Sequence, residues 1–176
     1  MRAFLALPLP ASDAEVLEAM GDRLGFGSVV PAENMHLTLA FLGEVEEPLL
    51  REAADALETL QPPAFSFRLS GLSTYGTALA LDADGGAALS DLQARVKSRL
   101  TGAGLVLERR RFRPHVTFAR LPERRTPEEE RKFAAFLADE STMRIDEVPA
   151  REFVLYESIL TKSGAVHEPL AEFELA

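Results

Sequence analysis

Cysteine is absent from the 176 residues of the chain. A disulfide framework is therefore excluded, and neither a thiolate nucleophile nor a cysteine metal ligand is available. Long apolar runs are missing too, since no stretch approaches the roughly twenty residues that a membrane span needs. The apolar start, MRAFLALPLP, is short and holds two prolines, so we expect a first strand there rather than a secretory signal. These absences predict a cytoplasmic protein that is not bound to a membrane.

Positive charge is also scarce, because 19 basic residues face 28 acidic ones and the net charge is −9. A broad basic surface for nucleic acid is therefore not expected. One short stretch nevertheless holds seven arginines, namely Arg109, Arg110, Arg111, Arg113, Arg120, Arg124 and Arg125. The stretch is either a solvated charge run or a local anion site. An anion site on an otherwise acidic chain suits a small phosphate or an RNA end better than a long duplex.

The hydrophobic periodicity predicts an α+β chain. Expected strands cover residues 3–9, 36–43, 65–72, 77–81, 115–120, 143–148 and 153–160, with a last short strand ending at Phe173 and Leu175. Expected helices cover residues 13–21, 46–60 and 87–100, and a fourth follows Thr126. Ser12 or Asp13 can cap the first helix. Thr126, followed by Pro127 and Glu129, predicts a capping box for the fourth.

Two of the three histidines begin the same short pattern, HLTL at residues 36–39 and HVTF at residues 115–118. The likeness continues, since HLTLAFLGEVEEP in the first half is answered by HVTFARLPERRTP in the second. An internal duplication within a single domain, residues 1–176, explains this repeat. Two lobes related by a pseudo-twofold axis would then bring the two motifs together.

Strand alternation gives each motif a polar face. In a strand, His36 and Thr38 point to one side while Leu37 points to the other, and His115 and Thr117 share a side in the same way. A lone histidine on a strand is usually structural. The repeat of histidine with threonine in the same strand context favours a functional site at both motifs.

Three chemistries compete for such a site. Two histidines could bind zinc, but a catalytic zinc normally has three protein ligands, and no carboxylate stands at a suitable spacing. Thr38 or Thr117 could act as a nucleophile with histidine as its base, but a triad also needs an orienting carboxylate. In the third, one neutral and one protonated imidazole act together as base and acid on opposite sides of a phosphate. Threonine hydroxyls would then stabilise its non-bridging oxygens. Only this third scheme uses all four motif residues, and it needs no metal.

The segments ENMHLTLAFLGEV, FRPHVTFAR and LYESIL…SGAVHEPL resemble the two-histidine phosphoesterase superfamily. Within it, the chain is most similar to the RNA 2′,3′-cyclic phosphodiesterases, historically called 2′-5′ RNA ligases. The resemblance implies a bilobal α+β fold with two antiparallel sheets around a central cleft and helices outside. It also implies an enzyme that opens an RNA-terminal 2′,3′-cyclic phosphate to a 2′-phosphate without metal or cofactor.

The resemblance further implies a role for each motif residue. His36 would be the general acid and His115 the general base, with Thr38 and Thr117 holding the phosphate. Arg120 would contact the substrate, although strand alternation places it on the opposite face from His115 unless the strand bends. Family members often carry an aromatic residue, commonly tyrosine, at the position of His167, which is either a tolerated surface change or an altered substrate contact.

The expected substrates are RNA ends or small cyclic nucleotides, and we expect a monomer without an obligate protein partner. Two other functions fit the same residues. One is cleavage or joining of 2′-5′-linked oligonucleotides. The other is a nucleotide-binding module without turnover, against which the intact histidines and threonines of both motifs argue.

Overall fold

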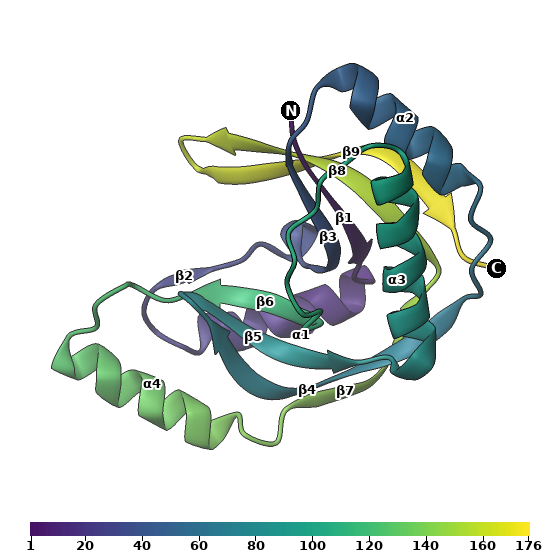
Figure 1. The fold of residues 1–176 in the computed structure, drawn as a ribbon. Coiled ribbons are helices and arrows are strands. Elements are labelled where there is room, and N and C mark those ends of the chain that lie inside the picture. The colour runs from purple at the N-terminus through teal and green to yellow at the C-terminus, as the bar shows by residue number, and fades with distance from the viewer.

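The computed structural model describes residues 1–176, and the expected alternation of strands and helices is present (Figure 1). The strands are β1 (Arg2–Pro8), β2 (Ser28–Val29), β3 (His36–Glu44), β4 (Phe65–Tyr75), β5 (Ala78–Asp84), β6 (His115–Arg120), β7 (Arg144–Ala150), β8 (Glu152–Thr161) and β9 (Gly164–Glu174). The helices are α1 (Ala11–Asp22), α2 (Glu47–Glu58), α3 (Gly86–Gly102) and α4 (Pro127–Asp139), with a 3₁₀ turn at Ala32–Asn34. The α+β fold class expected from the sequence is therefore confirmed.

The strands form one curled antiparallel sheet in the order β7-β4-β5-β6-β3-β1-β8-β9, with β2 added beside β6. The two sheets expected from the sequence are its two halves, β7-β4-β5-β6 and β3-β1-β8-β9, which lie in the lower and upper parts of Figure 1. They meet at a single residue pair, Leu37 with Val116. The two motif strands, β3 and β6, are thus neighbours at the centre of the sheet.

The same order of strands and helices occurs twice along the chain, once around β3 and once around β6. Apart from the short β2 and the 3₁₀ turn, the run β1-α1-β3-α2-β4 is followed by the matching run β5-α3-β6-α4-β7. The neighbour of β3 is β1, the first strand of its run, and the neighbour of β6 is β5, the first strand of the next. We infer that the single domain arose by the internal duplication that the motifs predict, and the repeated order of elements supports this inference.

Apolar residues of both halves and all four helices form one core behind the sheet. Leu37 and Val116 are fully buried in it, so the opposite faces of β3 and β6 are left for the motif residues. Helices α2 and α3 pack side by side, with α3 also against β3 and β4 and α2 against β9, whereas α4 lies away from them on the other side of the molecule (Figure 1). None of the helices combines the length and the apolar character needed to cross a membrane.

The capping box predicted for the fourth helix is confirmed by the structure. Thr126 accepts a hydrogen bond from the Glu129 backbone N–H at 3.2 Å, and the Glu129 carboxylate accepts one from the Thr126 N–H at 2.9 Å. These two bonds complete the capping box of α4. Pro48 lies in the first turn of α2, where its missing N–H costs nothing. Gly76, with φ of 62°, makes the turn between β4 and β5.

Two local predictions are wrong. The first helix is not capped by Ser12 or Asp13, because Pro10 is its N-cap residue and the helix begins at Ala11. Proline fixes φ and directs the chain from β1 straight into the helix, so Asp13 falls in the first turn, where its charge favours the helix dipole. The last strand is not short, since β9 has 11 residues and pairs with β8 along its whole length. Its Pro169 is tolerated because β9 is an edge strand.

Candidate active site

The pairing of β3 with β6 brings all four motif residues onto one surface. Leu37 lies opposite Val116 in an antiparallel pair, so this register sets His36 beside Thr117 and Thr38 beside His115. All four side chains are half-buried, whereas Leu37 and Val116 are buried behind them. The two histidines therefore occupy diagonal corners of a four-residue cluster. Such diagonal positions are about 7–8 Å apart in a sheet, which leaves room for one phosphate between the rings.

Both imidazoles are held in the same way. The Nδ1–H of His36 donates to the backbone oxygen of Asn34 at 2.7 Å, and the Nδ1–H of His115 donates to that of Arg113 at 2.6 Å. A carbonyl oxygen only accepts, so each ring carries its Nδ1 proton in both charge states. The Nε2 atoms are the ones left for proton transfer. The sequence gives no signal for these partners, because backbone oxygens carry no residue type.

His36 lies among aromatic rings. The Phe4 ring centroid is 4.8 Å away, and the His167 ring stands edge-on at 5.4 Å. Burial lowers the pKa of His36 from 6.5 to about 4. The Asn34 carbonyl opposes this shift, while the positive charges of His167, Arg120 and His115 add to it. The free protein thus favours neutral His36 at neutral pH.

This shift predicts a pH-dependent contribution of His36 to stability. Because the folded-state pKa lies below the ordinary value, the unfolded chain binds the proton more readily between pH 6.5 and 4. Stability is therefore present above pH 6.5 and lost as the pH falls toward 4, by at most about 3 kcal/mol. We expect His36→Asn to lose less unfolding free energy than the wild type when denaturation at pH 7 and pH 4.5 is compared. Equal losses in the two proteins would contradict the shift.

Arg120 reaches the motif face because β6 bends. Leu79 of β5 pairs with Ala119, but the next residue, Ala80, pairs with Thr117, so Phe118 is an extra residue in β6. Such a β-bulge reverses the alternation of side chains beyond it. Phe118 and Ala119 are both buried, whereas Arg120 is exposed and its charge acts on His36, which places it on the side of the motif residues. The bend that Arg120 needs in order to share a strand face with His115 is therefore present.

The matching bulge in β3 turns Phe41 outward. Leu5 of β1 pairs with Ala40, and the next residue, Ala6, pairs with Thr38, so Leu39 is the extra residue. Phe41 holds the place in the first motif that Arg120 holds in the second. Phe41 is 67% exposed, and its ring centroid lies 6.5 Å from that of Phe4, which also contacts His36. Sequence analysis missed Phe41 because simple alternation from His36 points it into the core.

His167 lies at the site rather than on a remote surface. Its ring is edge-on to those of His36 and Phe4, and its buried Nδ1 atom has no hydrogen-bond partner in the protein. Burial lowers the pKa of His167. The third histidine thus contributes a polar edge beside the first motif.

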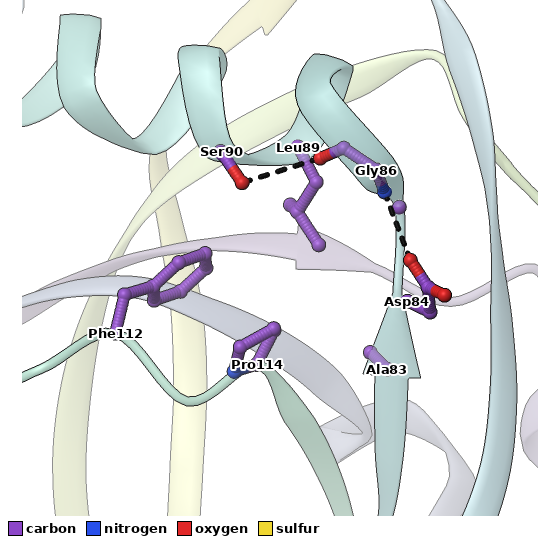
Figure 2. Close-up of a pocket in the computed structure, with 8 residues that line it drawn as sticks. Ala83, Asp84, Gly86, Leu89, Ser90, Phe112 and Pro114 are labelled. Atoms are coloured by element: carbon purple, nitrogen blue, oxygen red, sulfur yellow. Dashed lines mark hydrogen bonds between the residues drawn. The ribbon is translucent and has the colours of Figure 1, made fainter.

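A separate shallow pocket of about 220 Å³ opens at the start of α3 (Figure 2). Phe112, Pro114 and Leu89 line it, together with Ala83 and Asp84. The Gly86 N–H at the helix start donates to the Asp84 carboxylate at 3.0 Å, so the protein itself supplies the anion there. Elsewhere, no three histidine, aspartate or glutamate side chains gather in a way that could hold a metal ion.

Comparison with known proteins gives consistent results. Residues 8–152 match the model of the 2′-5′ RNA ligase superfamily. A protein of Aeropyrum pernix named RNA 2′,3′-cyclic phosphodiesterase is 31% identical over 153 residues, which cover 84% of this chain and 85% of that protein. A protein of the same name from Thermotoga maritima is 30% identical over 184 residues, covering 98% of this chain and 94% of the relative.

Solved structures show the same fold. A protein of Thermus thermophilus superposes with a TM-score of 0.80 at 23% identity, covering 99% of this chain and 98% of the other. E. coli LigT complexed with 3′-AMP gives a TM-score of 0.76 at 24% identity, with coverage of 99% and 97%. The resemblance that the two histidine motifs suggest is confirmed, and the chain belongs to the 2′-5′ RNA ligase superfamily.

Proposed function

We propose that this protein hydrolyses RNA-terminal 2′,3′-cyclic phosphates to 2′-phosphates by paired-histidine acid–base catalysis without metal. The observation that carries the proposal is the crossed pairing of the two motifs, which sets two imidazoles diagonally about a space of phosphate size. Relatives named RNA 2′,3′-cyclic phosphodiesterase support the same reaction.

The reaction runs in line through the phosphorus atom. Nε2 of His115 takes a proton from water, and the water oxygen forms a new bond to phosphorus. The bond from phosphorus to the ribose O3′ breaks on the opposite side, and O3′ takes a proton from Nε2 of His36. The products are a 2′-phosphate and a free 3′-hydroxyl. Thr38 and Thr117 donate to the non-bridging oxygens, whose charge grows in the transition state.

The acid role of His36 depends on the bound phosphate. Burial and the neighbouring positive charges hold the pKa of His36 down to about 4 in the free protein. A phosphate anion in the cleft opposes those charges and raises the pKa of His36, so the substrate itself promotes protonation of the acid. A proton held by such a group is readily given to the leaving O3′.

The other residues on the motif face suit a nucleotide. Arg120 is close enough to His36 for its charge to act on that ring, so it can contact the phosphate of a substrate bound between the motifs. The exposed ring of Phe41 offers a flat apolar surface on which a nucleobase can stack. One cation and one exposed ring, flanking the four-residue cluster, fit the end of an RNA or a small cyclic nucleotide.

Hydrolysis of a nucleoside 2′,3′-cyclic phosphate in EDTA, with identification of the product isomer, tests the proposal. We expect metal-independent turnover to the 2′-phosphate alone. Formation of the 3′-phosphate, or loss of turnover in EDTA that added metal restores, would count against the reaction as written. Binding of the nucleotide without turnover would favour the binding module. Turnover only of a 2′-5′-linked dinucleotide would favour that linkage as the substrate.

A further inference from the structure

The ring of Tyr75 lies flat against the imidazole of His115. The two ring centroids are 3.9 Å apart and the planes are tilted by only 10°. Tyr75 is the last residue of β4, next to the turn at Gly76, and His115 is the first residue of β6. The contact therefore joins one end of each strand across the intervening β5.

Tyr75 is itself anchored. Its hydroxyl donates to Oδ1 of Asp82 at 2.7 Å, and the hydroxyl of Ser73 donates to Oδ2 at 2.7 Å. Asp82 lies directly opposite His115 in the register of β5 with β6. Burial and the bond to Asp82 raise the pKa of Tyr75 to about 12, so its hydroxyl remains a donor at physiological pH. Both oxygens of the carboxylate are thus used to fix the tyrosine and its strand.

The two contacts of the His115 ring restrict different motions. The hydrogen bond from Nδ1 to the Arg113 oxygen fixes which nitrogen points inward. The stack on Tyr75 fixes the plane of the ring. We propose that Tyr75, anchored by Asp82 and Ser73, is a positioning residue that aims Nε2 of His115 and stabilises the imidazolium formed when it takes a proton.

The charges around His115 support the second half of this proposal. When water gives its proton to Nε2, the ring becomes a cation against the face of an aromatic ring whose hydroxyl donates to a carboxylate. Asp82 lies opposite His115 in the strand register and holds the stacked tyrosine, Arg113 acts on the same tyrosine, and His36 is a further cation only when it is protonated. An aromatic face and a carboxylate attract such a cation, whereas Arg113 and a protonated His36 repel it.

His36 has no stacked ring anchored by a carboxylate, although its motif corresponds to that of His115. The residue opposite His36 in the neighbouring strand is Pro8, where His115 has Asp82. The nearest ring to His36 is that of Phe4, tilted by 33° and without a polar group. The duplication has thus kept the two motifs and changed what lies behind them, which suits His115 to accepting a proton and His36 to giving one.

This inference rests on the proposed hydrolysis, so the experiment pairs kinetics with a readout that needs no turnover. Tyr75→Leu removes the ring, Tyr75→Phe keeps the ring without its anchor, and Asp82→Asn keeps the shape without the charge. Thr74→Ala is the matched control, since Thr74 is exposed on the opposite face of the same strand. The measurements are kcat and KM on a nucleoside 2′,3′-cyclic phosphate, and the ¹⁵N NMR signals of the His115 imidazole in the free protein.

We expect Tyr75→Leu to lower kcat by about 10- to 100-fold with KM within about twofold, since misorientation of a reacting group has effects of this size. Tyr75→Phe and Asp82→Asn should lose less, and Thr74→Ala should match the wild type. Without the stack the His115 ring can turn out of line with the Arg113 oxygen and lose that bond, so its nitrogen signals should change from a single Nδ1–H tautomer to a mixture in Tyr75→Leu.

Wild-type kcat together with unchanged nitrogen signals in both Tyr75→Leu and Asp82→Asn would overturn the inference. If Tyr75→Leu does not fold, Asp82→Asn and Tyr75→Phe decide the matter by the same two readouts. If the wild type fails to turn over the substrate, the proposed function falls, while the nitrogen signals still test whether Tyr75 positions His115.

Discussion

His36→Ala and His115→Ala should each lower kcat on a nucleoside 2′,3′-cyclic phosphate by about 10²–10⁴-fold, the usual contribution of a general acid or base. Each variant removes one of the two Nε2 atoms to which the proposed reaction assigns a proton transfer, while the other ring keeps its bond to a backbone oxygen. Because both groups act in the same step, the double variant should be little slower than the worse single variant.

His167→Ala is the matched control for this prediction. It removes the third and last histidine, whose ring touches that of His36 but which lies outside both motifs. We expect a loss smaller than about tenfold, below the range of a general acid or base. Loss of kcat in His167→Ala equal to that in His36→Ala would contradict the assignment of the acid to the motif histidine. Retention of more than a tenth of wild-type kcat in either motif variant would contradict paired catalysis.

A substrate with sulfur in place of the bridging O3′ separates the two roles. A thiolate leaves without a proton, so the general acid becomes dispensable while the base is still required. We expect His36→Ala to regain most of its activity on this substrate and His115→Ala to remain slow. The reverse pattern would assign the acid to His115. It would contradict the roles inferred from the neighbours of the two rings, Asp82 opposite His115 and Pro8 opposite His36.

Much of the site could be predicted from the sequence because the four motif residues lie in two short segments, each with a recognisable pattern. The pattern of a histidine, an apolar residue and a threonine fixes which side chains share a strand face, and its repetition indicates that both copies are used. The strands themselves follow from apolar runs ended by glycine or proline. What the sequence could not supply is the single pair, Leu37 with Val116, that crosses the two motifs. Long-range register is set by packing of the whole core and leaves no local pattern.

The misplaced residues have a common physical cause. Strand alternation counts residues as if every strand were regular, and β-bulges in both motif strands break that count. The bulges bring Arg120 and Phe41 to the face of the sheet that carries the motif residues, whereas regular strands would turn them toward the core. The contact of Tyr75 with His115 joins β4 to β6 across β5, and a contact between residues so far apart in the chain leaves no local pattern in the sequence.

Thr38→Val and Thr117→Val should each lower kcat by about 10²-fold, since valine has the shape of threonine without the hydroxyl and losing one preorganised donor to a developing oxyanion is costly. The loss should fall on kcat rather than KM, because the non-bridging oxygens carry more charge in the transition state than in the bound substrate. Thr38→Ser and Thr117→Ser should retain most activity, and Thr74→Val, on an exposed strand face away from the motifs, should have none of these effects.

The crossed pairing allows a sharper test of the same threonines. Thr117 lies beside His36 and Thr38 lies beside His115, so each hydroxyl is closest to the histidine of the other motif. If each threonine serves the phosphate oxygen nearest its neighbouring ring, the loss from Thr117→Val should shrink when it is made in His36→Ala, and the loss from Thr38→Val should shrink in His115→Ala. Stronger coupling within a motif, between Thr38 and His36 or between Thr117 and His115, would mean that each strand works as a separate unit. The first pattern requires both lobes for every contact with the phosphate, and that dependence gives a physical reason for the duplicated motif to be kept in both halves of the chain.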